Sequence, residues 1–263
     1  MSNFDPWDIE GGVPRRVMPL IFLVDTSGSM SGAKIASLNT AVREALNDVG
    51  EISHNNSDAQ IKVAALEFSS GVSWMYPQPM DSESFVWQDL EAGGLTCFGE
   101  ALNELNNKLS KSHGFMAEPT GSRAPAIILL SDGEPTDEYK HALEKINGNR
   151  WFKVAVKVAI AIGDDADTNV LAEFTGNVES VITVHTVDQL KKIIHTVSVT
   201  ASQVASQSAS VGTTSPEEPA GVADPNNQVV STLTNDINTD PTLAGVDQGN
   251  STTNSGTDDW GDW

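Results

Sequence analysis

Cysteine is almost absent from this sequence. Among 263 residues only position 97 is a cysteine, so no disulfide can form within the chain. Disulfides are typical of oxidising compartments, and their absence fits a reducing one. Long hydrophobic runs are also missing. No segment reaches the roughly 18 apolar residues that a membrane helix needs, and residues 1–16 lack the apolar core of a signal peptide. We therefore expect a cytoplasmic protein.

Basic residues are scarce as well. Lys and Arg number 15 against 36 Asp and Glu, which gives a formal net charge of −21. Nucleic-acid binding requires a basic face that displaces counterions from phosphates, and anionic membrane surfaces attract clusters of basic residues. This charge balance predicts that neither nucleic acid nor a membrane is a partner.

The chain divides into three regions by composition. Residues 1–16 are expected to form an irregular lead-in, and residues 17–207 a single domain. Residues 208–263 contain no Lys or Arg and few large apolar residues, so we expect a disordered acidic tail. The tail ends in Trp260 and Trp263. These tryptophans either anchor in a partner's pocket, or fold back on the domain, or have no role.

The hydrophobic pattern of residues 17–207 predicts an α/β fold. Continuous apolar runs are typical of strands buried in a parallel sheet, and they alternate with segments of helical periodicity. The strand at 71–75 follows its predecessor after only a few residues, so it should pair antiparallel at an edge. The result is a doubly wound, mostly parallel six-stranded sheet with helices on both faces. Predicted strands lie at 18–24, 61–68, 71–75, 126–130, 152–162 and 181–184, and predicted helices at 31–49, 99–109, 137–147, 168–175 and from 187.

The first buried strand ends at an acidic residue that is followed by two hydroxyl residues. Asp25, Ser27 and Ser29 occupy alternate positions of one loop. Open α/β sheets place their ligand sites in loops at the carboxyl ends of strands. Carboxylate and hydroxyl oxygens are hard ligands that suit Mg²⁺ or Mn²⁺ better than zinc. This loop is therefore the starting point of a predicted metal site.

Two later segments supply further oxygen ligands. Thr96 lies in a loop that follows Gly93 and Gly94, and Asp132 ends the apolar strand 126–130. Any one of these residues alone is better explained as a cap of a loop or helix. Together with Asp25, Ser27 and Ser29 they make five oxygen-bearing residues, each in a loop next to a predicted strand or helix. The combination favours a metal site.

This set of residues resembles the metal-ion-dependent adhesion site of the von Willebrand factor A family, over roughly residues 17–200. The resemblance implies that Ser27, Ser29 and Thr96 bind the ion directly, while Asp25 and Asp132 act partly through water. Since neutral hydroxyls donate little charge, the ion would remain attractive to an Asp or Glu of a partner protein. The resemblance thus implies protein binding through a metal, without catalysis.

Within that family, the segment Leu23–Met30 and the acidic turn 162–167 are similar to the bacterial tellurite-resistance (TerY-like) proteins. This similarity implies a scaffold in a stress response, with a PP2C-type phosphatase and a protein kinase as partners. An adaptor for a chaperone-type ATPase is an alternative. A Mg²⁺-dependent phosphohydrolase is disfavoured, because haloacid-dehalogenase enzymes need a second Asp where this chain has Ser27.

Two other features allow more than one interpretation. Cys97, next to Thr96, is either a catalytic thiol or, as is commoner, a small buried side chain. Asp164, Asp165 and Asp167 form an acidic turn that lacks the EF-hand pattern. We expect this turn to cap the helix at 168–175 and not to bind a second metal ion.

Overall fold

A mixed β-sheet forms the centre of the protein. The computed structural model describes residues 15–57, 59–164, 166–207 and 224–249. The order of strands across the sheet is β3-β2-β1-β5-β6-β7-β8, and β4 pairs with β2. Five strands are parallel, and β3 pairs antiparallel with β2 at one edge, as predicted. The strands are β1 (Arg16–Asp25), β2 (Ala59–Phe68), β3 (Val72–Trp74), β4 (Met80–Asp81), β5 (Ala126–Ser131), β6 (Val156–Ile162), β7 (Val181–Val184) and β8 (Asp247–Gln248).

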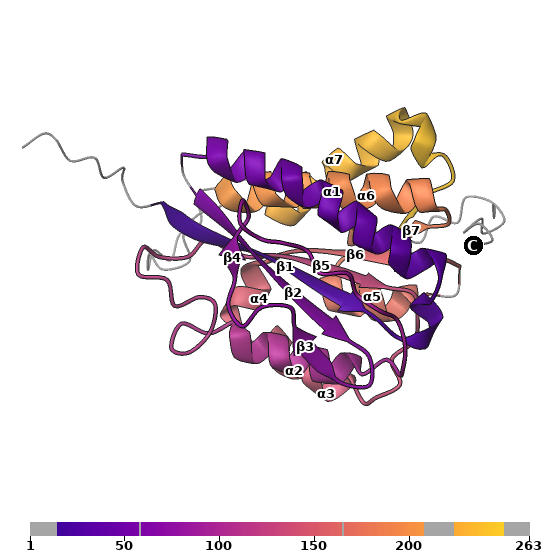
Figure 1. The fold of residues 1–263 in the computed structure, drawn as a ribbon, viewed down its shortest axis with the longest axis horizontal. Coiled ribbons are helices and arrows are strands. Elements are labelled where there is room, and N and C mark those ends of the chain that lie inside the picture. Colours follow the sequence, from indigo (N-terminus) through magenta and orange to yellow (C-terminus); the bar gives the residue numbers. More distant parts are fainter. Residues whose placement is uncertain (1–14, 58, 165, 208–223, 250–263) are drawn as a thin grey trace, which may run out of the picture.

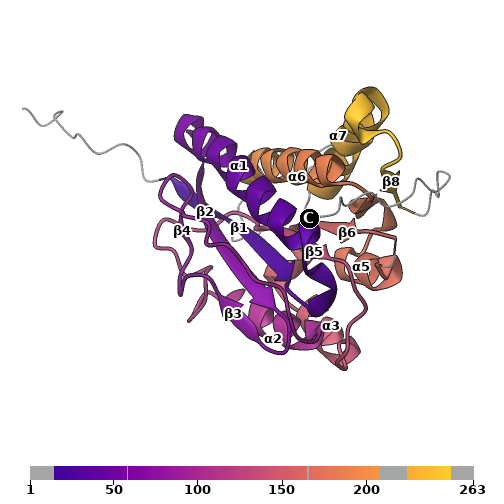
Figure 2. The same ribbon diagram turned by 45° about the vertical axis from the view of Figure 1, so that its right-hand side comes forward.

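Helices cover both faces of this sheet. In Figures 1 and 2, α1, α6 and α7 lie on one face, and α2, α3 and α5 lie on the other. The helices are α1 (Ala33–Asn55), α2 (Phe98–Lys108), α3 (Lys140–Asn147), α4 (Arg150–Val154), α5 (Thr168–Thr175), α6 (Val187–Gln207) and α7 (Pro225–Thr239), with short 3-10 helices η1 (Gly28–Met30), η2 (Val178–Ser180) and η3 (Pro241–Leu243). The doubly wound α/β architecture predicted from the sequence is confirmed.

The central strand β1 explains why the sheet needs helices on both sides. Leu20 and Phe22 pack into the core beneath α1 and α6, whereas Ile21 and Leu23 pack into the core beneath α2, α3 and α5. All four side chains are fully buried. Because successive side chains of a strand point to opposite faces, a continuous apolar run can be buried only between two layers. The acid that ends β1 therefore emerges at a sheet edge that is covered on both sides.

Several predicted boundaries were wrong. The predicted stop of the first helix at Gly50 is not used, and α1 continues to Asn55. The helix ends where the Arg15 guanidinium donates hydrogen bonds to the carbonyls of Ser53 and Asn56, at 2.6 and 2.7 Å. These bonds satisfy carbonyls that a helix end leaves unpaired. A Cβ at Gly50 would lie 3.8 Å from the Cα of Glu83, an ordinary van der Waals contact, so this position does not require glycine.

The strand predicted at 152–162 begins only at Val156. The preceding residues form the short helix α4, which Asn149 caps by accepting a hydrogen bond from the Trp151 N–H. The helix predicted at 137–147 likewise starts later, at Lys140, because Asp137 is used elsewhere. Its carboxylate accepts the N–H groups of Gly99 and Glu100 at the start of α2, at 3.0 and 3.1 Å.

The expectation of a disordered tail is wrong for residues 224–249. Asp224 caps α7 and Pro225 follows at its first position, a favoured start for a helix. Val229 and Leu233 of α7 are fully buried in the core beneath α6. Strand β8 then pairs antiparallel with β7, which adds a strand to the predicted six, as β4 does beside β2. Residues 1–14, 208–223 and 250–263, and with them Trp260 and Trp263, lie outside the described residues.

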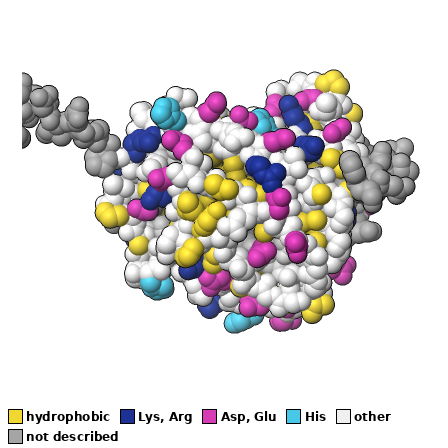
Figure 3. Space-filling view, viewed as in Figure 1, with side chains coloured by type: hydrophobic (Ala, Val, Ile, Leu, Met, Phe, Trp, Pro, Cys, Tyr) yellow, Lys and Arg dark blue, Asp and Glu magenta, His cyan; other side chains and the backbone are white. Residues whose placement is uncertain are grey.

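The surface agrees with the composition. On the face drawn in Figure 3, Lys and Arg side chains lie singly among acidic ones and form no continuous basic patch. Among the residues that the structure describes, no helix combines the length and the apolar character that crossing a bilayer demands.

Candidate metal site

Asp25 is the innermost residue of the candidate site. It ends β1 with no exposed surface, and both of its carboxylate oxygens accept hydrogen bonds. The backbone N–H of Ser27 donates to Oδ1 at 2.8 Å, and the hydroxyl of Ser131 donates to Oδ2 at 2.7 Å. Burial nevertheless raises the pKa of Asp25, because removal from water disfavours the charged form more than these bonds favour it. The negative charge of Asp132 raises this pKa further. A cation at this position would therefore relieve an unfavourable buried charge.

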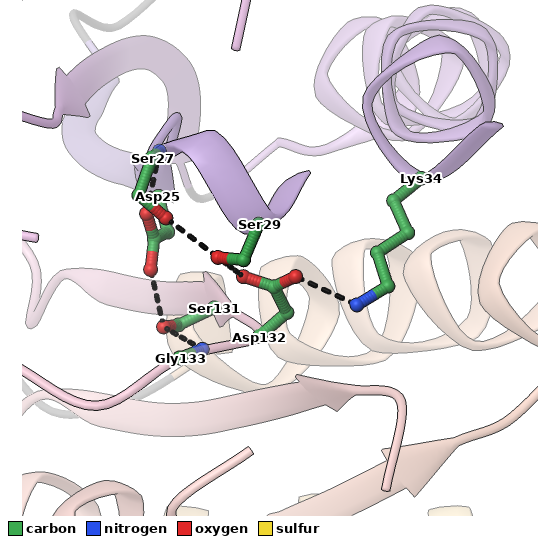
Figure 4. Close-up of polar contacts among 7 residues, drawn as sticks. All are labelled: Asp25, Ser27, Ser29, Lys34, Ser131, Asp132 and Gly133. Carbon is green, nitrogen blue, oxygen red and sulfur yellow. Dashed lines mark hydrogen bonds and ion pairs between the residues drawn. The ribbon is translucent and has the colours of Figure 1, made fainter. Parts of the chain in front are cut away.

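A chain of oxygen atoms leads outward from the loop after β1 (Figure 4). The hydroxyl oxygens of Ser27 and Ser29 lie 2.9 Å apart. The hydroxyl of Ser29 donates to Oδ1 of Asp132 at 2.7 Å, and Lys34 Nζ contacts Oδ2 of the same carboxylate at 2.7 Å. Ser27 and Asp132 are buried, whereas Ser29 is exposed. The cluster is thus reached from solvent on the Ser29 side.

The loop that carries Thr96 is fastened to the other two loops of the site. Backbone hydrogen bonds join Gly93 to Thr26 and Gly28 to Gly94, at 2.8 and 3.2 Å. The N–H of Thr96 donates to the hydroxyl of Thr136, and the Thr136 N–H donates back to the Thr96 carbonyl. Thr136 therefore holds this loop in place.

The Thr96 hydroxyl lies close to Gly133, in the loop after β5. A Cβ on this glycine would lie 3.5 Å from the Ser29 hydroxyl oxygen and 3.9 Å from that of Thr96. The two hydroxyls therefore flank the same point of the backbone, next to Asp132. The fold brings all five predicted positions together at the carboxyl ends of β1 and β5.

The spacing of these oxygens suits a small divalent cation. Adjacent ligands of octahedral Mg²⁺ lie about 2.9 Å apart, because bonds of about 2.0–2.1 Å meet at right angles. The contacts from Ser27 to Ser29 and from Ser29 to Asp132 measure 2.9 and 2.7 Å. Within the described ranges, no three His, Cys, Asp or Glu side chains converge to hold a metal ion, so the candidate ligands here include hydroxyl oxygens beside two carboxylates, a hard-oxygen set. The donor set therefore fits Mg²⁺ or Mn²⁺.

Two residues of this cluster were not predicted. Ser131, the last residue of β5, donates to Asp25, and Lys34 pairs with Asp132. Ser131 directly precedes a predicted ligand, and this adjacency was the only signal for it in the sequence. Lys34 had no such signal, because its relation to Asp132 depends on how α1 packs over the loop.

The two ambiguous features have explanations without catalysis or a second ion. Partial burial and the charges of Asp137 and Glu100 raise the pKa of the Cys97 thiol, which disfavours a reactive thiolate. In the acidic turn, Asp167 accepts hydrogen bonds from the first turn of α5, as predicted for a cap.

His185 has a larger structural role than the sequence indicated. In the structure it is buried, and its two ring nitrogens lie 2.6 Å from a carboxylate oxygen of Asp164 and 3.4 Å from one of Asp247. It thereby links the acidic turn to β8.

Comparison with known proteins identifies the domain. The family model for the von Willebrand factor type A domain matches residues 20–196, more than half of the chain. The chain belongs to the von Willebrand factor type A (VWA) family. Its VWA domain contains the whole candidate site, from the loop after β1 to the loop after β5.

Two human proteins are similar in sequence to this VWA domain. Inter-alpha-trypsin inhibitor heavy chain H6 is 27% identical over 176 residues, which are 64% of this chain and 13% of that protein. The collagen alpha-6(VI) chain is 27% identical over 179 residues, which are 66% of this chain and 7% of that protein. This chain thus spans only a small part of the length of either relative.

Solved structures agree with the fold. A von Willebrand factor type A protein from Catenulispora acidiphila matches with a TM-score of 0.53 and 17% identity, over 71% of this chain and 43% of that one. The pilus adhesin SpaC from Lactobacillus rhamnosus GG matches with a TM-score of 0.56 and 14% identity, over 72% and 30%. The mussel byssus protein PTMP1, in a form described as having a zinc occupied MIDAS motif, matches with a TM-score of 0.50 and 16% identity, over 71% and 48%.

Proposed function

We propose that this protein is a metal-dependent protein-binding module. Asp25, Ser27, Ser29, Thr96 and Asp132 would hold a Mg²⁺ or Mn²⁺ ion, and an Asp or Glu of a partner protein would complete its coordination. The observation that carries this proposal is the run of ligand oxygens at 2.9 and 2.7 Å, which opens to solvent at Ser29.

The composition of the donor set explains why such a site would bind a partner. When bound, the ion supplies a positive charge that accepts an external carboxylate. Of the five residues only Ser29 is exposed, and its hydroxyl is neutral, so the external side of the site is occupied by a weak donor. Hydrogen bonds from Ser27 and Ser131 fix the Asp25 carboxylate, which lets the loop keep its shape without a partner.

We propose that the module is not an enzyme. Two residues after Asp25 the chain has Ser27, where haloacid-dehalogenase enzymes need a second Asp as general acid. The Ser27 hydroxyl contacts that of Ser29 and does not replace this carboxyl group. The resemblance to TerY-like proteins supports a cytoplasmic stress-response scaffold, with a PP2C-type phosphatase and a protein kinase as its partners. An adaptor for a chaperone-type ATPase would use the same five residues.

The proposal is tested by affinity capture with wild-type protein and Asp25→Asn, each in Mg²⁺ and in EDTA. Asp137→Asn is the control, because Asp137 is a neighbouring acid whose carboxylate accepts backbone N–H groups at the start of α2. We expect partners that are captured by the wild type and the control in Mg²⁺, and lost in EDTA and with Asp25→Asn. A phosphatase and kinase among them would support the stress-response scaffold, and an ATPase would support the adaptor. Partners that are independent of both the metal and Asp25 would refute metal-dependent binding.

A further inference from the structure

Lys34 is the one cation that contacts the candidate ligands among the described residues. It lies in the first turn of α1, and its side chain reaches down to the loop after β5 (Figure 4). Its Nζ lies 2.7 Å from Oδ2 of Asp132, while Oδ1 of the same carboxylate accepts the Ser29 hydroxyl. The Asp132 side chain is fully buried, and that of Lys34 is 18% exposed. Lys34 therefore binds the ligand carboxylate without occupying the oxygen that faces the other ligands.

The positive charge of Lys34 is favourable in the metal-free protein and unfavourable for binding of a metal ion. Without an ion, a fully buried carboxylate needs a cation, since an unpaired charge in the interior is strongly unfavourable. With an ion bound, the Lys34 ammonium repels it, because both cations share the carboxylate of Asp132. The charges of Asp25 and Asp132 together equal that of a divalent ion, and Lys34 adds a positive charge next to them.

We propose that Lys34 is a counter-cation built into the metal site. It stabilises Asp132 in the metal-free protein, weakens binding of the divalent ion, and increases the attraction of the loaded site for a carboxylate of a partner. The inference rests on the proposed function and concerns the same site. Because both Ser29 and Lys34 reach solvent beside the buried carboxylates, an acidic side chain that arrives at the ion also meets the ammonium.

Substitution of Lys34 by Met tests this role, because Met keeps the length of the side chain and removes its charge. Lys34→Gln is a second neutral variant, and Lys34→Arg keeps the charge. Lys153→Met is the control for loss of one positive charge, since Lys153 is exposed on α4, before the amino end of β6. Circular dichroism establishes that each variant is folded.

Three measurements are made on each protein. Thermal unfolding in EDTA gives the stability of the metal-free form, and calorimetric titration with Mg²⁺ and Mn²⁺ gives the affinity for the ion. Paramagnetic broadening of the acetate proton signal by the Mn²⁺-loaded protein reports binding of a carboxylate at the ion.

For both neutral variants we expect a lower Tm in EDTA, an affinity for the ion that is about tenfold higher, and weaker broadening of acetate. Lys34→Arg and Lys153→Met should resemble the wild type in all three measurements. A role of Lys34 in folding alone would lower the affinity for the ion, because Asp132 would lose its position.

Neutral variants that bind the ion as weakly as the wild type, or more weakly, would overturn the role of Lys34 and leave the metal site intact. Unchanged broadening of acetate would overturn it as well. A wild-type protein that binds neither ion would refute the proposed function itself, and this inference with it.

Discussion

Replacement of Asp25 by Asn should change the stability of the protein in opposite directions with and without metal. Asn has the same shape as Asp and can keep both contacts. Its oxygen can accept the Ser27 N–H, and its amide can donate to the Ser131 hydroxyl in place of the bond that Ser131 now donates. The variant therefore removes the charge of Asp25 with little change in packing.

The magnitude follows from burial. Asp25 is fully buried, and desolvation is the largest cause of its raised pKa, so its charge destabilises the metal-free fold. We expect the free energy of unfolding of Asp25→Asn in EDTA to exceed that of the wild type by on the order of 1 kcal/mol. Mg²⁺ at 100 times its Kd should stabilise the wild type by about 2.7 kcal/mol and the variant by much less, because the variant lacks a charged ligand.

Urea unfolding in EDTA and in Mg²⁺ measures both effects, with Asp137→Asn as the control. The control should be less stable than the wild type, because the substitution weakens the two hydrogen bonds from Asp137 to the start of α2. Mg²⁺ should nevertheless stabilise the control as much as it stabilises the wild type. The reasoning would be refuted if Mg²⁺ stabilised Asp25→Asn as strongly as the wild type, or if the variant were less stable than the wild type in EDTA.

Three further predictions concern pH, the added helix and a helix end. The raised pKa of Asp25 means that the folded state holds its proton more tightly than the unfolded state. The advantage of Asp25→Asn in EDTA should therefore be full above the folded-state pKa of Asp25 and shrink as pH falls through it; a pH-independent difference in Tm would contradict this. Asn226→Ala removes two hydrogen bonds, one to the N–H of Lys157 in β6 and one to the carbonyl of Ala155 just before it. The substitution should speed hydrogen exchange in α7, whereas Asn227→Ala, at an exposed position, should not. Gly176→Ala places a side chain at a residue with a φ of 75° at the end of α5, so it should lower the free energy of unfolding in urea by about 1 kcal/mol. Gly71→Ala is the control and should not lower it, because a Cβ there would meet open space.

The parts of the fold that are visible in the sequence are those governed by local pattern. The apolar run before Asp25 has no polar interruption, so it indicates a strand buried on both sides, and the acid that ends it marks the ligand edge. Asp132 follows its own buried strand in the same way, whereas Thr96 lies in a loop after two glycines, just before α2. Residues that only tertiary packing brings to the site, such as Lys34, could not be placed in this way.

The error in the tail has a different origin. Averaged over residues 208–263, the composition is polar, and this average concealed a short helical signal. Asp224 and Pro225 are a typical helix start, and Val229, Val230 and Leu233 lie at helical spacing on the face that becomes buried. Strand β8 has only two residues, so its pairing with β7 has no local signal in the sequence.

The central claim is that Asp25, Ser27, Ser29, Thr96 and Asp132 together bind a divalent ion. Anomalous diffraction from crystals of the full chain grown with Mn²⁺ tests this claim most directly, because it locates the ion independently of any partner. We predict one strong anomalous peak within bonding distance of the Ser27 and Ser29 hydroxyl oxygens, and no such peak in crystals of Asp25→Asn. A strong peak elsewhere, or none in the wild type at saturating Mn²⁺, would contradict the account.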